Sequence, residues 1–286
     1  MPALLLWLVQ DVDALKALGA EVVAKDGQIT KVTFKDCSKL GEAEYRVLGG
    51  LKTLKSLTLY GGKKTLTDAT LPHLTTLTEL EELNTEGTHL TDDGLKHFAA
   101  FKNVKSMAFY HPSLDVKGFT GAGFAALKEL PKLERLTIAG TRADDRLMEA
   151  VGQVTQLKDF RTWHTQQSQA GNAHLRKLPQ LRHLTLGQRL RRWDGGSNAL
   201  SLDDATLDVL SKLSTLESLS LDETRLSLDA LLKLKALPNL KKLELRRIEI
   251  NAEDVEKLKA ALGSVKVDVK PLTDEERKKL EAYLKA

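Results

Sequence analysis

Apolar residues recur along the chain in short runs of the form Leu-x-x-Leu-x-Leu, with polar residues at the positions between them. Nine residues open such runs: Ile29, Leu54, Leu80, Val104, Leu133, Leu157, Leu181, Leu216 and Leu240. Consecutive openings lie 24 residues apart in four cases and 25 to 35 residues apart in the others. Alternation within each run predicts a strand with one buried face, and its recurrence indicates stacked structural repeats.

A helix start follows each strand at a constant distance once short insertions are set aside. The residues at this position all favour a helix N-cap: Thr67, Thr91, Thr120, Asp144, Ser168, Asp203, Ser227 and Asn251. Apolar residues four and seven positions further on, such as Leu71 and Leu74, share one face of a short helix. Each unit is therefore predicted to be a strand, a turn and a helix, which bury their apolar sides by stacking on neighbouring units.

One repeat shows the pattern in full, because Leu80-x-x-Leu-x-Thr-x-x-Thr88-x-Leu90 is followed by Thr91-Asp-Asp-Gly-Leu95. This repeat resembles the bacterial type of leucine-rich repeat, LxxLxLxxTxLTDxGLxxL. It is distantly similar to the cysteine-containing repeats of F-box proteins, although the chain has no F-box. The resemblance implies an α/β solenoid, a horseshoe or arc with a parallel inner β-sheet, helices on the convex side, and about nine repeats plus terminal caps.

We expect three parts along the chain. Residues 1–25 form an N-terminal cap with an apolar segment and a short helix, residues 26–262 hold the repeats, and residues 263–286 form a C-terminal strand and a capping helix. The capping helix is expected to begin at the capping box Thr273–Glu276. Three of its residues are expected to face the last repeat: Leu280, Tyr283 and Leu284.

The apolar segment over residues 1–9 bears on location. It is far shorter than the roughly 20 residues needed to cross a bilayer, so no membrane span is expected. A cytoplasmic location is slightly favoured, while export stays open if the chain begins upstream of Met1. We expect a monomer.

Composition then excludes several classes of function. Leucine supplies 55 of the 286 residues, and 43 basic residues against 39 acidic ones give a net charge of +4. The side chains predicted to face the concave surface include nine basic and eight acidic groups, which argues against a nucleic-acid partner. The single cysteine, Cys37, rules out an internal disulfide and is expected to be a packed core thiol.

The rare aromatic residues gather on the predicted concave face. Tyr60, Tyr110 and Trp163 occupy the same seventh position of their runs. Because Tyr, Trp and Arg supply much of the binding energy at protein interfaces, this face is predicted to bind a protein partner. The alternative is that the rings pack on one another or lie beneath the inserted loops. The residues expected to contact a partner are Tyr60, Glu86, Tyr110, His111, Arg135, Arg161, Trp163, His164, His183, Arg191, Arg192 and Trp193.

Two insertions, over residues 111–123 and 189–199, leave the predicted sheet at the C-terminal ends of their strands. The second is predicted to form a cationic and aromatic projection from Arg189, Arg191, Arg192 and Trp193. Such a projection is suited to an acidic protein surface, a phosphate or a sugar, and it is equally compatible with a solvated loop. The alternative function is therefore binding of an anionic or carbohydrate ligand through the Arg189–Trp193 loop.

No catalytic motif accompanies these features. The sequence has no phosphate loop, no dinucleotide fingerprint and no nucleophilic serine elbow. Three histidines could in principle hold a zinc ion, but nothing in the sequence spacing brings the nitrogens of His111, His164 and His183 together. We therefore expect no enzyme activity, no metal and no cofactor. The predicted function is a non-enzymatic protein-protein interaction module or scaffold whose partner is unknown.

Overall fold

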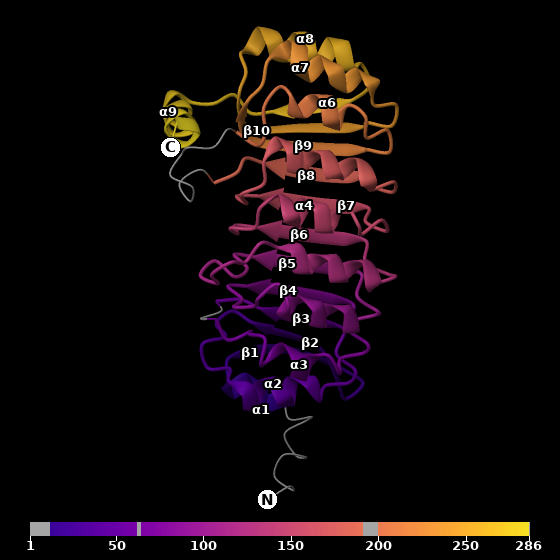
Figure 1. The fold of residues 1–286 in the computed structure, drawn as a ribbon, viewed down its shortest axis with the longest axis vertical. Helices are drawn as coiled ribbons and strands as arrows, with labels where there is room; N and C mark the ends of the chain where they lie inside the picture. The colour runs from indigo at the N-terminus through magenta and orange to yellow at the C-terminus, as the bar shows by residue number, and fades with distance from the viewer. Residues whose placement is uncertain (1–11, 62–63, 191–199, 286) are drawn as a thin grey trace, which may run out of the picture. The chain divides into compact units, whose positions relative to one another are not determined.

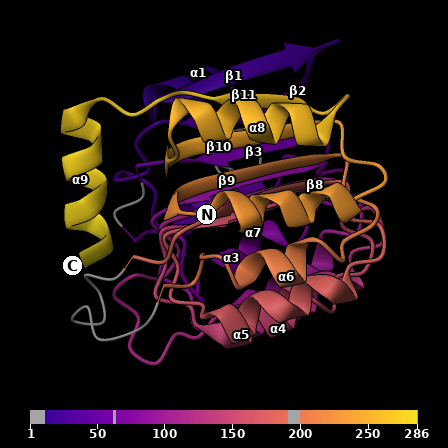
Figure 2. The same ribbon diagram turned by 90° about the horizontal axis from the view of Figure 1, so that it is seen from above.

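A computed structural model describes residues 12–61, 64–190 and 200–285. The chain forms two compact units, Met1–Thr141 and Arg142–Ala286. In each unit, strand–turn–helix segments repeat, with strands gathered in a sheet and helices on one of its faces (Figures 1 and 2). Each unit therefore has the α/β leucine-rich-repeat fold that the repeat pattern predicted.

In the first unit a β-hairpin precedes the parallel strands. Helix α1 (Val12–Ala17) leads into β1 (Ala20–Lys25), which pairs antiparallel with β2 (Gln28–Phe34). The following strands each pair parallel with the one before: β3 (Ser56–Leu59), β4 (Glu82–Glu86), β5 (Ser106–Tyr110) and β6 (Arg135–Ala139). The helices between them are α2 (Glu42–Gly49), α3 (Leu71–Leu74) and the 3-10 helices η2 (Gly94–Ala100) and η3 (Ala122–Glu129).

The leucine pattern predicts ten strands, and β1 is an additional strand that it misses. Asp26 and Gly27, with φ of 52° and 75°, form the turn between β1 and β2. Positive φ at both central residues is the mark of the tight hairpin turn for which Asp-Gly is a favoured sequence. The Asp-Gly pair between two apolar alternations was thus a readable signal for this hairpin.

In the second unit all strand pairs are parallel and follow chain order. The strands are β7 (Asp159–Trp163), β8 (His183–Gly187), β9 (Ser218–Arg225), β10 (Lys242–Glu249) and β11 (Lys266–Val269). The helices are α4 (Asp145–Val151), α5 (Gln169–Asn172), η4 (Ala173–Lys177), α6 (Thr206–Leu210), α7 (Leu228–Leu232), η6 (Lys233–Ala236), α8 (Ala252–Leu262) and α9 (Asp274–Lys285). None of the helices in the described ranges combines the length and the apolar composition of a membrane-spanning segment.

The apolar positions of the repeat form the core, as predicted. Leu54, Leu57 and Leu59 of one run are at most 1% exposed. Cys37 is also buried, as expected, and burial together with the nearby charge of Asp36 raises the pKa of its thiol to about 12. A buried thiol with a raised pKa is chemically quiet, which agrees with a packing role.

All eight predicted cap residues accept a backbone N–H two or three residues further on, through the side chain. In several repeats the residue after the cap forms a second contact that the sequence did not predict. Its carboxylate accepts the backbone N–H of the next repeat's cap residue. The carboxylates concerned belong to Asp68, Asp92, Asp145 and Asp204. The acidic pairs at helix starts therefore connect neighbouring repeats as well as capping their own helices.

Helix α9 begins at the predicted capping box, where Thr273 and Glu276 exchange side-chain to backbone hydrogen bonds. Its position differs from the prediction. The Tyr283 hydroxyl donates to the backbone carbonyl of Arg189 at 3.0 Å, and its ring lies 5.9 Å from that of His164. The helix packs beside β9 and β10, along the strand ends of several repeats, instead of against the last repeat alone (Figure 1).

Candidate functional site

A left-handed backbone recurs at the eighth residue of the runs, just after the strand in most of them and inside β9 and β10 in two. All nine of these positions lie in the described part of the chain, and seven have positive φ: Gly61, Gly87, His111, Gly140, His164, Glu223 and Arg247. We call these seven residues the rim positions. A left-handed backbone costs a non-glycine residue roughly 1–2 kcal/mol. Four rim positions nevertheless carry large polar side chains, and such departures concentrate at functional sites.

In the first unit, Tyr60 and Tyr110 pack edge to face with ring centroids 6.0 Å apart. Both remain partly exposed on the helix-free side of the sheet. The rings thus contact each other, which was one of the two alternatives expected for them. Burial is the main cause that raises the pKa of Tyr60, and the nearby Tyr110 phenol and Glu86 carboxylate raise it further.

Glu86 lies beside this pair, on the strand between the two tyrosines. It accepts the backbone N–H of Gly61 at 3.3 Å and lies 3.4 Å from Nδ1 of His111. Arg135, also expected to contact a partner, lies 3.9 Å from Glu82 and remains exposed. The first unit therefore presents a small aromatic patch with Glu86 and His111 at its edge.

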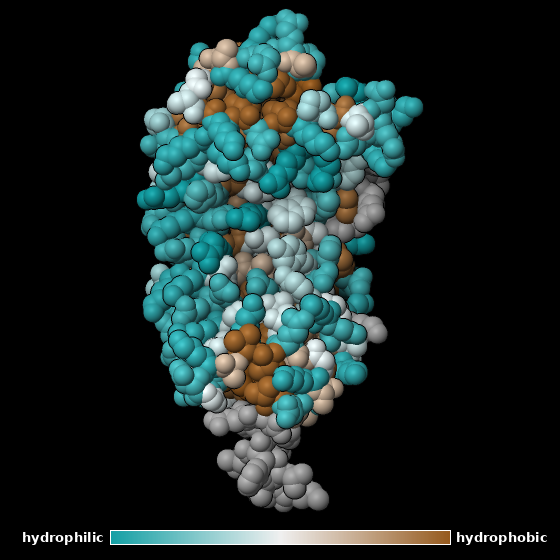
Figure 3. All heavy atoms as spheres, turned by 180° about the vertical axis from the view of Figure 1, so that it is seen from behind, coloured by the Kyte–Doolittle hydropathy of each residue, from teal (hydrophilic) through white to brown (hydrophobic). Residues whose placement is uncertain are grey.

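In the second unit, strands β7 to β10 form a groove of about 470 Å³ on the helix-free face. Strand register sets three rows of side chains across it. The two outer strands carry large residues, whereas β8 and β9 contribute the small residues Thr185, Ser218 and Ser220 together with His183 and Leu184. In Figure 3, which looks at the side opposite the helices, most exposed side chains are hydrophilic.

One wall of the groove comes from β7, with Asp159, Arg161 and Trp163. Arg161 binds Asp159 through two hydrogen bonds of 3.0 and 2.8 Å, and Asp159 is only 8% exposed. Trp163 lies against β8, since a Cβ placed on Gly187 would be 2.5 Å from the Cβ of Trp163. The structure therefore brings together Arg161, Trp163 and His183, three of the residues predicted to contact a partner.

The opposite wall comes from β10, with Lys242, Glu244 and Arg246. Glu244 accepts hydrogen bonds from Lys242 and, at 2.6 Å, from Arg246, and these bonds hold its pKa below the usual value. Sequence reasoning missed this wall and the serines of the floor. Their signal was position, because they occupy the same third, fifth and seventh places in their runs as the predicted residues.

A second cluster lies at the rim of this unit, beneath α9. Nε2 of His164 lies 2.5 Å from Glu223, and Arg247 contacts both Glu223, at 3.1 Å, and Asp222, at 2.5 Å. Burial alone would raise the pKa of Glu223, but His164 and Arg247 lower it below its usual value. Burial raises the pKa of Asp222 to about 6.

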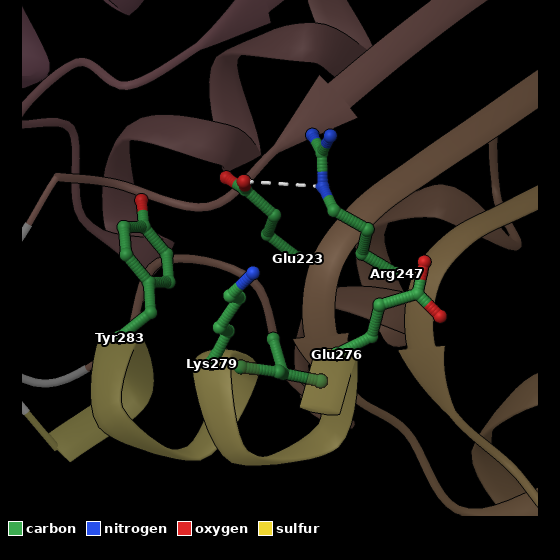
Figure 4. A pocket seen from close by; sticks show the side chains of 6 residues that line it. Glu223, Arg247, Glu276, Lys279 and Tyr283 are labelled. Carbon is green, nitrogen blue, oxygen red and sulfur yellow. Dashed lines mark ion pairs between the residues drawn. The ribbon is translucent and has the colours of Figure 1, made fainter. Parts of the chain in front are cut away.

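Helix α9 closes over this cluster. Glu223 and Arg247 line a cavity of about 290 Å³ together with Lys279, Leu280 and Tyr283 of the helix. Figure 4 shows the Tyr283 and Lys279 side chains pointing toward Glu223. His164, predicted to face a partner, is instead occupied by contacts within its own unit.

The base of the second insertion is held by Gln188, which is fully buried. Its side-chain oxygen accepts the backbone N–H of Ser201 at 2.8 Å, and its nitrogen donates to the carbonyl of Leu202 at 2.9 Å. Arg189 is only 5% exposed, so the prediction that it belongs to a projecting loop is wrong. The other residues predicted there, Arg191, Arg192 and Trp193, lie outside the described residues.

Among the residues that the structure describes, no group of three or more His, Cys, Asp and Glu side chains is arranged to hold a metal ion. His111 faces Glu86, His164 contacts Glu223, and His183 lines the groove. The groove therefore offers paired charges, hydroxyl groups and an aromatic ring as its means of recognition.

No protein-family model and no curated protein matches the chain. Among solved structures, it is similar to internalin C2 from Listeria monocytogenes, with 19% identity and a TM-score of 0.48, over 79% of this chain and 84% of the internalin. It is also similar to a chain in the complex of Rad7 and Elc1 from yeast, with 16% identity and a TM-score of 0.46, over 86% and 76% of the two chains.

Proposed function

We propose that the protein is a non-enzymatic protein-protein interaction module whose partner binds on the helix-free face of the sheet. The observation that supports this most directly is the groove over β7 to β10. It places Trp163 beside Arg161 at the edge of a hollow with a floor of small residues. Aromatic and Arg side chains at such concave, partly desolvated positions supply most of the binding energy at protein interfaces.

The pairing of charges in the groove favours a preformed binding surface. Arg161 is held by two bonds to Asp159, and Arg246 by Glu244, so these long side chains lose little further freedom when a partner binds. In the first unit, Tyr60 and Tyr110 with Glu86 and His111 form a second contact patch in this proposal. Ligand binding by the Arg189–Trp193 loop stays a prediction.

Affinity capture from the native host, followed by titration of each captured protein, tests the proposal. Replacing Trp163 by Ala should weaken binding of the captured partner by about 2 kcal/mol, or roughly 30-fold, with the fold intact. Lys212→Ala is the matched control, because Lys212 is exposed just after α6, on the helical side. A Trp163→Ala/Tyr110→Ala variant that retains the same partners at the same affinity would overturn the proposal.

A further inference from the structure

The hydrogen-bond acceptors in the walls of the groove are already used. Both carboxylate oxygens of Asp159 accept from Arg161, at 3.0 and 2.8 Å. Both oxygens of Glu244 accept as well, one from Lys242 and the other from Arg246. A ligand that enters the groove therefore meets carboxylates that are already paired with cations of the protein.

Donors, in contrast, are left over. Within the described part of the chain, Lys242 and Arg246 each donate one hydrogen bond, to Glu244, whereas an ammonium has three N–H groups and a guanidinium has five. At the floor between the walls, Ser220 is 5% exposed, and its hydroxyl has no hydrogen-bond partner in the described part of the chain. A buried hydroxyl without a partner is costly, and a bound acceptor would remove that cost.

The net charge of the groove also favours a ligand that carries hydrogen-bond acceptors. Three permanent cations, Arg161, Lys242 and Arg246, face two carboxylates, and His183 adds a further positive charge when protonated. Strands β7 and β10 are three strand spacings apart, roughly 14 Å, so a narrow segment has room to reach the serines between the walls. A donor-rich, net cationic groove is complementary to a ligand that carries negatively charged acceptors.

We infer that this groove binds an acidic segment of a protein partner, with a carboxylate placed between Ser220 and the cations of β10. The inference rests on the proposed protein-binding function and specifies the chemistry of the partner. A nucleic acid fits less well, because its evenly spaced phosphates would pass the carboxylates of Asp159 and Glu244 as well as the cations. Separate carboxylates along a peptide avoid that repulsion.

The test uses the full chain and two labelled twelve-residue peptides, one alternating Glu and Ser, the other alternating Gln and Ser. Fluorescence anisotropy at low salt should show the Glu peptide binding at least about tenfold more tightly than the Gln peptide. Lys242→Met and Arg246→Gln should each weaken the Glu peptide by about tenfold, and added salt should weaken it further. Lys212→Met, which removes a cation on the helical side, should leave the affinity unchanged.

Two serine variants examine the floor. Ser220→Ala removes the hydroxyl and leaves the shape, whereas Ser220→Val also fills the space; both should weaken the Glu peptide. The inference would be overturned if the two peptides bound equally well, or if Lys212→Met lost as much affinity as Lys242→Met and Arg246→Gln. Tighter binding of a ten-nucleotide single-stranded DNA than of the Glu peptide would also overturn it. If a captured partner depends on Trp163 while neither peptide binds, the proposed function stands and the acidic segment is wrong. If the Glu peptide binds but partner capture does not depend on Trp163, the preference of the groove for an acidic segment stands and the proposed function is wrong.

Discussion

The carboxylate of Asp68 fills the space that a side chain at Gly94 would need, since a Cβ on Gly94 would lie 1.7 Å from Asp68 Oδ1. The same carboxylate accepts the backbone N–H and the hydroxyl of Thr91, at 3.0 and 2.6 Å. The relationship recurs in the second unit, where a Cβ on Gly171 would lie 2.3 Å from Asp145. The glycine of the Thr-Asp-x-Gly pattern is therefore required because it admits the aspartate of the preceding repeat.

This contact predicts the effect of Gly94→Ala. The new methyl group forces Asp68 away from Thr91 and breaks two hydrogen bonds, so the free energy of unfolding should fall by about 2 kcal/mol. In an Asp68→Ala background the clash and the bonds are already absent, and the same change should cost far less. Urea denaturation of the four proteins measures the difference, and an equal loss in both backgrounds would falsify this account.

Gly123 offers a contrast at the same place in the next repeat. A Cβ on Gly123 would lie 2.0 Å from the backbone carbonyl oxygen of Asp92, and a backbone atom cannot move aside as a side chain can. Gly123→Ala should therefore destabilise the protein by about 3 kcal/mol or more. Asp92→Ala should not rescue it, because the obstructing atom remains. Recovery of stability in the double variant, measured by the same denaturation, would count against the steric argument.

The raised pKa of Asp222, about 6, predicts a pH dependence of stability. An Asp carboxyl in the unfolded chain ionises near pH 4, so between about pH 4 and 6 the folded state holds a proton that the unfolded state has lost. The contribution of this group is thus complete below about pH 4 and disappears as the pH rises to about 6. Wild type should lose stability relative to Asp222→Asn across this range.

Glu223→Gln is the matched control for this measurement, because the pKa of Glu223 is lowered. The contribution of Glu223 to the free energy of unfolding is present above the unfolded pKa of about 4.3 and is lost on acidification. This pH dependence has the opposite sign to that of Asp222. Denaturation midpoints of the three proteins from about pH 3 to 8 test both directions. A difference between wild type and Asp222→Asn that stays constant with pH would show that Asp222 does not titrate in this way.

The contacts of α9 predict that this helix is released more easily than the repeats. Only Leu280 and Leu284 of the helix are buried, and the rest of its attachment comes from the hydroxyl of Tyr283 on the Arg189 carbonyl, the contact of its ring with His164, and exposed ion pairs such as Arg225 with Glu281. Tyr283→Phe removes about 1 kcal/mol of that attachment, and salt near 1 M screens the ion pairs. Amide hydrogen exchange in α9 should accelerate about fivefold in either case, while β9 and β10 stay protected. Tyr60→Phe, in the other unit, should leave α9 unaffected.

The groove shows how far the sequence could lead. Because side chains on a strand alternate with a period of two, the run pattern predicted that Arg161 and Trp163 lie on the helix-free side, and they do. The hollow beside them depends on small residues on the two inner strands, and it becomes visible only when the register aligns Thr185 with Ser220. Lys242 and Glu244 were counted as balanced surface charge, since nothing in their spacing shows that they form one wall.

The position of α9 could not be predicted from the sequence, for a different reason. Its capping box is a local signal and was predicted correctly, whereas the surface on which it packs is set by contacts between residues far apart in the chain. Tyr283 and Arg189 are 94 residues apart and share a hydrogen bond. Arg189 was predicted to project because a cationic run usually faces solvent, but Tyr283 and the clamp at Gln188 hold its backbone in a buried position.

The rim positions give a last prediction, in which stability and binding separate. His111 has φ of 49°, and its side chain is 53% exposed. His111→Gly removes a backbone cost of roughly 1–2 kcal/mol. It loses an exposed ion pair worth about 0–1 kcal/mol and adds about 0.5–1 kcal/mol of chain entropy to the unfolded state. The free energy of unfolding should therefore change little, while affinity for the partner falls.

Gly87→Ala makes the opposite change at the equivalent position of the preceding strand, where φ is 66°. It should destabilise the protein by about 1 kcal/mol, because alanine pays the left-handed cost without any compensating contact. His111→Ala, which keeps that cost and removes the imidazole, separates the two effects. If His111→Gly destabilises the protein as much as Gly87→Ala does, the imidazole holds the turn through Glu86, and the rim histidine is structural. If His111→Gly keeps stability and loses binding, the strained backbone is retained for the contact that His111 makes with the partner.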